Sequence, residues 1–129
     1  MARKRVPTDA LGTAGKALSA RLGREGYVRV GGLHGGSAGF VLAHLARPEG
    51  SLLVVVPDAR AMDAIRLDLD AVLKSRCLPF QAWPRDSQEA GPPDPDVLSA
   101  RVAVLQRAAA TRREATKEPL VVVAPLAAL

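Results

Sequence analysis

The chain has 129 residues, which fits one domain with one hydrophobic core. Hydrophobic residues make up 48% and charged residues 24%, a globular composition that excludes an intrinsically disordered chain. The net charge of +5 fits contact with nucleic acid or simple solubility, whereas a total of two Phe, one Trp and one Tyr disfavours a sheet on which RNA bases stack.

The first third of the chain predicts a helix, a strand, a glycine loop and a short helix. Thr8 or Asp9 can cap a first helix that Gly26 ends, and its apolar residues share one face. Tyr27–Val30 alternates and predicts a strand before the glycines, and Pro48 ends the short helix that follows them. The apolar residues of the two helices are Leu11, Ala14, Leu18 and Leu22, then Phe40, Val41, Leu42 and Leu45.

The middle third predicts two strands with the clearest helix of the chain between them. Leu52–Val56 is continuously apolar, which predicts a central strand covered on both faces. Asp58 caps a helix whose apolar stripe leaves four charged residues free to face water, and Leu78–Phe80 predicts a third strand. The stripe consists of Met62, Ile65, Leu69, Val72 and Leu73, and the charged residues are Arg60, Arg66, Asp68 and Asp70.

The last third begins with an exposed loop from Pro84 to Pro95, rich in Pro, Gly and acidic residues. Asp96 then starts a helix, residues 111–117 are turn-like, and Leu120–Val123 is a second fully apolar strand before a helical turn that begins at Pro125. Leu98, Val102 and Leu105 share one side of the helix, flanked by Val97, Ala100 and Val104.

Strands separated by helices predict an α/β fold, a parallel sheet flanked by helices. We expect residues 1–8 to form a basic flexible tail and residues 9–129 a domain that resembles a P-loop NTPase in degenerate form. The last strand is followed by only one turn of helix, which would have little to bury, so we expect an incomplete domain that depends on partners for stability.

The glycine-rich segment from Gly31 to Phe40 is the candidate functional site. A phosphate loop needs inward backbone amides, a helix N-terminus, a Lys for the outer phosphates and a Ser or Thr for magnesium. Aligning G-x-x-x-x-G-K-[ST] from Gly31 or from Gly32 leaves the Lys position without a Lys. ATP hydrolysis is therefore not expected, and a tight structural turn is favoured over a weak anion site. The candidates for such a site are Gly32, Gly35, Gly36 and Ser37.

Other chemistry-bearing residues favour structural roles. Cys77 and two histidines cannot complete a zinc site at a familiar spacing, so no metal site and no catalytic residue is predicted. Cys77 fits a half-buried residue at the entrance of a strand, His34 an exposed imidazole, and His44 a half-buried histidine with a partner. Trp83, at the start of the polar loop, is expected to pack on the sheet.

The basic N-terminus is a candidate nucleic-acid contact. Arg3, Lys4 and Arg5 could touch phosphate without reading sequence, although a solvated tail is the commoner outcome. No apolar region of a signal peptide follows them. The longest strongly apolar run, Leu52–Val56, is too short to cross a bilayer, so we expect a cytoplasmic chain without a membrane segment.

Five segments resemble, in order and spacing, the start of the bacterial transcription-repair coupling factor, Mfd. The resemblance covers about residues 10–129 and is similar in layout to the first domain of UvrB, whose loop keeps a working Lys. Pro84 is followed by Arg85, Asp86 and Ser87, where the family commonly has an aromatic residue. The segments consist of Gly32–Ala38, Leu52–Asp58 with Ala61 and Leu69, Phe80 with Trp83–Pro84, Pro95–Leu105, and Val121–Leu129.

The resemblance implies a noncatalytic scaffold domain with no cofactor of its own. The family's protein is an ATP-dependent DNA translocase that displaces stalled RNA polymerase and recruits excision repair through UvrA. Its first domain is a degenerate nucleotide-binding fold, and ATP and magnesium belong to motor domains further along the chain. Contacts to UvrA, RNA polymerase and DNA also lie mainly beyond this segment, so its contribution would be structural and autoinhibitory packing against downstream domains.

Two alternatives remain open from the residues alone. One is a small nucleotide- or anion-binding module that uses the loop at residues 31–39 with a cation from elsewhere, such as Arg29 or Arg60. The other is a sequence-independent DNA-binding domain that uses the basic tail together with Arg112 and Arg113.

Overall fold

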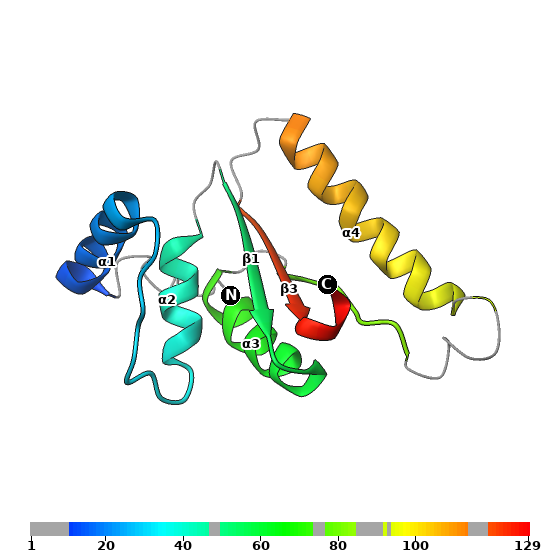
Figure 1. Cartoon of the computed structure of the whole chain (residues 1–129), viewed down its shortest axis with the longest axis horizontal. Helices are drawn as coiled ribbons and strands as arrows, with labels where there is room; N and C mark the ends of the chain where they lie inside the picture. Colours follow the sequence, from blue (N-terminus) through cyan, green and yellow to red (C-terminus); the bar gives the residue numbers. More distant parts are fainter. Residues whose placement is uncertain (1–10, 47–49, 74–76, 85–91, 93, 114–118) are drawn as a thin grey trace, which may run out of the picture.

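A computed structural model of the chain shows four α-helices and a three-stranded parallel sheet in the part of the chain that it describes (Figure 1). The described residues are 11–46, 50–73, 77–84, 92, 94–113 and 119–129. The predicted α/β fold, a parallel sheet flanked by helices, is confirmed. The elements in chain order are α1 (Gly12–Glu25), α2 (Ser37–Leu45), β1 (Ser51–Val56), α3 (Ala59–Leu73), β2 (Cys77–Pro79), α4 (Pro95–Arg113), β3 (Leu120–Pro125) and the 3-10 turn η2 (Leu126–Ala128).

The strand that comes last in the chain lies in the middle of the sheet. The strand order is β1-β3-β2, with Leu52 opposite Val121 on one side and Cys77 opposite Val121 on the other. The prediction that Leu52–Val56 forms the central strand is therefore wrong. Among the described residues β1 pairs with β3 alone, and Leu53 and Val55 are 55% and 47% exposed. A run of apolar residues indicates that a strand suits a buried position, but it does not indicate which strands lie next to it.

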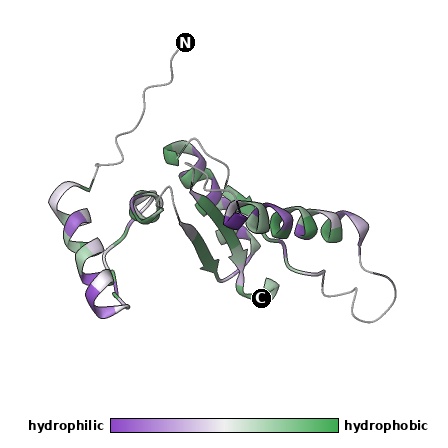
Figure 2. Ribbon diagram, turned by 90° about the horizontal axis from the view of Figure 1, so that it is seen from above, coloured by the Kyte–Doolittle hydropathy of each residue, from purple (hydrophilic) through white to green (hydrophobic). Residues whose placement is uncertain are grey.

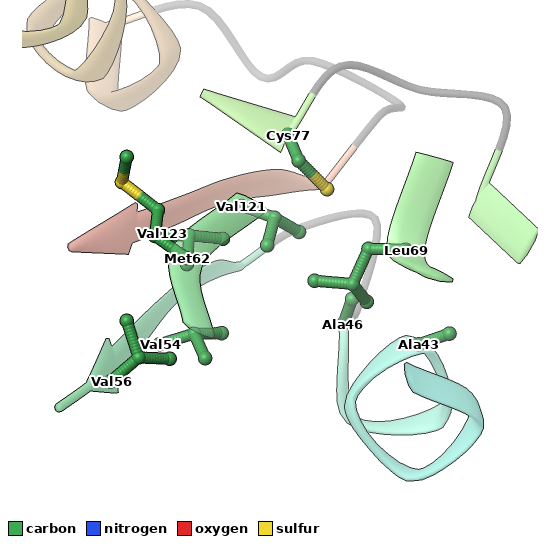
Figure 3. Close-up of a cluster of buried hydrophobic side chains, with 9 residues drawn as sticks. All are labelled: Ala43, Ala46, Val54, Val56, Met62, Leu69, Cys77, Val121 and Val123. Carbon is green, nitrogen blue, oxygen red and sulfur yellow. The ribbon is translucent and has the colours of Figure 1, made fainter. Parts of the chain in front are cut away.

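The main core lies between the sheet and α3. Asp58 caps α3 as predicted, because its Oδ1 accepts a hydrogen bond of 2.8 Å from the Ala61 amide. Leu69 is fully buried against residues of both outer strands and β3. Figure 3 shows the side chains of this core, which come from α2, α3 and all three strands. They are Ala43, Ala46, Val54, Val56, Met62, Leu69, Cys77, Val121 and Val123.

The segment between α1 and α2 contradicts a prediction. Tyr27–Val30 forms no strand: residues 27–34 have no regular secondary structure, and the Tyr27 side chain is 72% exposed. Alternation of apolar and polar residues favours an extended backbone, but a strand also needs a neighbour to accept its hydrogen bonds. The described residues provide no such neighbour here.

Helix α1 ends as predicted but packs differently. Gly26 takes the left-handed conformation (φ 69°) and its amide donates to the Leu22 carbonyl at 2.9 Å, which closes the helix. The predicted caps Thr8 and Asp9 lie outside the described residues. The buried residue of α1 is Gly15 rather than a member of the predicted apolar face. Both views place α1 at the opposite end of the molecule from α4 (Figures 1 and 2).

Helix α4 begins at Pro95, one residue before the predicted start at Asp96. Asp94 caps it, because its Oδ1 accepts from the Asp96 amide at 2.9 Å and its carbonyl accepts from the Leu98 amide at 3.0 Å. The helix runs on to Arg113, into residues 111–117 that were predicted as turn-like. The side that faces the sheet carries Val104, whereas Leu98, Val102 and Leu105 are 41% to 58% exposed. Apolar residues occupy two sides of α4, so their spacing could not decide which side is buried.

The turn predicted after the last strand is present, but its type and its first residue differ from the prediction. Pro125 ends β3 in an extended conformation, and the predicted helical turn is the 3-10 turn η2. The strands are the most uniformly hydrophobic part of the chain in Figure 2. None of the helices within the described ranges has the length and apolar character needed to cross a bilayer.

Candidate functional site: the glycine-rich loop before α2

The glycine-rich segment forms a tight turn into α2. Gly32 and Gly35 have φ of 73° and 54°, a left-handed conformation that glycine adopts without steric cost. The His34 amide donates to Ser37 Oγ at 2.8 Å, and the Ser37 amide donates back to the His34 carbonyl at 3.1 Å. These two hydrogen bonds close the turn by themselves. The hydroxyl that would approach magnesium in a phosphate loop is thus engaged with the backbone.

Two amides at the start of α2, one of them from the candidate residue Ser37, donate to backbone carbonyls of the loop. The Gly39 amide donates to the Gly36 carbonyl at 3.0 Å, in addition to the Ser37 amide bonded to His34. A phosphate loop presents its amides to the ligand instead. With no preceding strand, the nucleotide-binding-like part of the fold prediction has no support in the described residues.

A carboxylate from α3 lies at the N-terminus of α2. A methyl group added to Gly36 would lie 3.5 Å from Asp68 Oδ1, and one added to Gly39 would lie 2.7 Å from Asp68 Cβ. Asp68 was predicted to face water, but it is half-buried against this turn. A negative charge at the positive end of a helix is stabilising, and it repels a phosphate from the same position. Gly39 therefore makes room for α3 and not for a ligand.

No cation completes a phosphate site in the described structure. Arg29 and Arg60, the proposed substitutes for the missing Lys, are both exposed and have no hydrogen bond or ion pair among the described residues. The structure brings Gly35, Gly36 and Ser37 together in one turn, and Gly32 lies before it in a segment without regular secondary structure. Sequence reasoning did not identify Asp68, because nothing local to the loop indicates which residue of a helix 30 positions away packs against it.

The two histidines have the predicted environments. His34 is exposed in the turn. His44 is half-buried between helices, with its Nε2 3.2 Å from Ser19 Oγ, and a methyl group on Gly15 would lie 2.7 Å from its Cε1. The ring of His44 thus fills the space that Gly15 leaves between α1 and α2. Within the described ranges no group of three or more His, Cys, Asp or Glu side chains could hold a metal ion.

Cys77 lies in the core and is more buried than predicted, at 5% exposed. Burial raises the pKa of its thiol to about 12, with a further contribution from the Asp70 carboxylate, whose Oδ1 also accepts from the Cys77 amide at 3.3 Å. Only the thiolate is a good nucleophile, so the folded protein keeps this cysteine unreactive.

We therefore expect alkylation of Cys77 by iodoacetamide below pH 9 to be slower than that of a free thiol by roughly three orders of magnitude. Because the folded state favours the neutral thiol, its contribution to stability is complete below about pH 9 and is lost as the pH rises toward about 12. Mass spectrometry of the adduct in buffer and in denaturant measures the difference. Equal rates in both would contradict the buried position of the thiol.

Arg101 of α4 holds three segments together and was not singled out by sequence. Its Nη1 donates to the Gln81 carbonyl at 2.6 Å, and both terminal nitrogens reach the Ala128 carbonyl at 3.3 to 3.4 Å. The guanidinium also lies 4.0 Å from the centroid of the Phe80 ring and 4.8 Å from that of Trp83. Trp83 is therefore half-buried against an arginine of α4, whereas the sequence predicted packing on the sheet.

The candidate DNA contacts are only partly described. Arg3, Lys4 and Arg5 lie outside the described residues, as do Arg85–Ser87 of the polar loop. Arg112 and Arg113 are exposed in the last turn of α4, where cations favour the helix dipole. That position explains both arginines without a nucleic acid.

Comparison with models of protein families, with curated proteins and with solved structures found no match to this chain.

Proposed function

We propose that this chain is the noncatalytic front domain of a bacterial transcription-repair coupling factor. The proposal rests on the resemblance of five segments in fixed order, from Gly32–Ala38 to Val121–Leu129. In that role the domain acts as a scaffold in the cytoplasm. UvrA, RNA polymerase and DNA are partners of the whole factor, and ATP with magnesium serves its motor.

The observation that supports this proposal best is the state of the glycine-rich loop. The loop keeps its glycines and its position before a helix, but it has no Lys, its Ser37 hydroxyl is engaged, and Asp68 lies at the helix N-terminus. A loop with these features favours a scaffold over a nucleotide-binding switch, because the groups that stabilise transferred phosphate charge are missing.

A nucleotide titration tests the noncatalytic part of this proposal. We expect millimolar ATP with magnesium to leave the melting temperature unchanged. A ligand that saturates the folded state at 100 times its dissociation constant would stabilise it by about 2.7 kcal/mol. A clear stabilisation by ATP would favour the nucleotide-binding alternative. The variant Asp68→Asn removes the negative charge next to the loop. Its melting temperature with and without ATP is the control for repulsion between this carboxylate and the phosphates of ATP.

The family role is tested by the reading frame of the gene past codon 129. We expect coding sequence to continue into a UvrA-binding segment, a polymerase-binding module and a helicase motor. A stop codon directly after Leu129 would overturn the proposal, because this product would then lack every part that the family uses to contact UvrA, polymerase and DNA.

A further inference from the structure

An apolar cavity of about 270 Å³ lies between α4 and the face of the sheet that points away from the main core. Its innermost side chains are Leu120 of β3 and Val104 of α4, both 7% exposed. Consecutive side chains of a strand point to opposite faces of a sheet, so Leu120 and Val122 lie on the side away from Val121, which belongs to the core. We call this space the α4 cavity.

The walls of the α4 cavity are almost entirely apolar. Of the ten described residues that line it, nine are apolar, and the exception is Ser51 at the start of β1. No charged side chain is among these ten. An ion or a strongly polar molecule would lose its hydrogen bonds to water there without replacement, whereas an apolar molecule has none to lose. The walls therefore favour an uncharged, apolar ligand.

Two walls of the α4 cavity are held in place by Arg101, which does not itself line the cavity. Its guanidinium lies 4.0 Å from the centroid of the Phe80 ring, and its Nη2 donates to the Ala128 carbonyl at 3.3 Å. Phe80 and Leu129, the residue after Ala128, both line the cavity. Walls that are fixed before binding spare a ligand the entropic cost of ordering them.

The mouth of the α4 cavity is open to solvent. Leu53, Leu105 and Leu129 line it, and each of them is more than half exposed. A ligand that covers these three side chains removes apolar surface from water, which is favourable. An apolar cavity of about 150 Å³ holds benzene, so a cavity of about 270 Å³ suits roughly ten carbon atoms, the size of two fused aromatic rings.

We propose that the α4 cavity binds one small, uncharged, apolar molecule with the size and chemistry of a naphthalene ring carrying at most one hydroxyl group. The Ser51 side chain offers a hydrogen-bond partner for such a hydroxyl. A protein partner is disfavoured, because a stable interface needs about 800 Å² and about 20–30 residues on each side, whereas ten described residues line this cavity. The site is separate from the glycine-rich loop and does not depend on the function proposed above.

Calorimetric titration of the chain with 2-naphthol, which is uncharged at neutral pH, tests this proposal. We expect one molecule to bind per chain with a dissociation constant of roughly 0.1 mM. Naphthalene-2-sulfonate has the same rings with a fixed negative charge and should bind at least about tenfold more weakly. In methyl NMR spectra, 2-naphthol should shift the signals of Leu120 and Val122 and leave those of Leu69, in the main core, unchanged.

A substitution that fills the cavity tests its location. Ala108→Leu should weaken 2-naphthol binding at least about tenfold without lowering the melting temperature, because the larger side chain occupies the cavity and gains apolar contacts there. Ala109→Leu is the matched control. It makes the same change at the next position of α4, which is exposed and does not line the cavity, so binding should be unchanged.

The proposal is overturned if 2-naphthol does not bind up to its solubility limit, or if the sulfonate binds as tightly as 2-naphthol. Equal affinities of the natural chain and Ala108→Leu would also overturn it. If Ala108→Leu lowers the melting temperature, the methyl signals of the natural chain decide the location alone. Light scattering of the same samples should give the mass of one chain. A dimer that 2-naphthol dissociates would assign the cavity to a second copy and contradict the proposal.

Discussion

Replacing Gly39 with Val is expected to lower the free energy of unfolding by about 3 kcal/mol. The added Cβ alone would lie 2.7 Å from Asp68 Cβ and 3.4 Å from the Asp68 backbone carbonyl carbon. Neither atom is the end of a flexible side chain, so α2 must move away from α3. That movement would also loosen the contact of Ala43 with the core, since Ala43 lies one turn further along α2.

Thermal unfolding followed by circular dichroism measures this effect, as a fall in melting temperature of roughly 10 °C or more. Gly23→Ala is the matched control, because no atom lies within 4 Å of the added Cβ and Gly23 is also helical. Its better helix propensity should stabilise the protein by about 0.5–1 kcal/mol. An unchanged melting temperature for Gly39→Val would show that α2 and α3 are not in this close contact.

Arg101→Ala is expected to cost about 2–3 kcal/mol of stability. The substitution removes the guanidinium that donates hydrogen bonds to the Gln81 and Ala128 carbonyls. It also removes the cation that lies over the Phe80 ring. The chain from β2 to Trp83 and the turn η2 would both lose their attachment to α4.

The fluorescence of Trp83, the single tryptophan of the chain, reports this loss directly. We expect a red-shifted emission in Arg101→Ala at a temperature where the far-ultraviolet signal is still that of the folded chain. Arg101→Lys should restore little, because an ammonium lacks the planar fork that bonds and stacks together. Arg107→Ala, on the exposed side of the same helix, should leave both signals unchanged. An equal effect of the two alanine variants would contradict a specific role for Arg101.

Sequence patterns predicted the buried helices and strands well, because a buried element needs apolar residues at a regular spacing within a short segment. The runs Leu52–Val56 and Leu120–Val123 form strands, and the stripe from Met62 to Leu73 forms a helix with the predicted cap at Asp58. Gly26 ends α1 for a reason that is also local, its left-handed backbone. In each case a few adjacent residues determine the outcome.

The errors concern relations between segments that are far apart in the chain. The pattern at Tyr27–Val30 predicts an extended backbone, but pairing depends on a neighbour that the pattern does not contain. Strand order fails for the same reason, since β1 is apolar enough for the centre yet lies at an edge. On α4, apolar residues on two sides left the buried side undetermined until Val104 was placed against the sheet.

The sequence predicted which residues make up the glycine-rich loop, but not which residues of other elements contact it. The absence of a Lys from the loop is visible in sequence, and so is the expectation of a structural turn. The reason for Gly39 is not visible in the sequence, because this glycine makes room for Asp68 of another helix. Arg101 was missed on similar grounds, since its four contacts, with Phe80, Gln81, Trp83 and Ala128, come from segments distant in the sequence.

The position of β3 in the middle of the sheet also determines when this protein can fold during its synthesis. β1 and β2 each pair with β3 in the described sheet, and β3 starts at Leu120. A ribosome therefore releases both outer strands, with their apolar side chains, well before their common neighbour is made. The sheet forms only after translation has passed Pro125, so the apolar outer strands stay unpaired while the residues between them and β3 are made, a period in which chaperones would protect the nascent chain from aggregation.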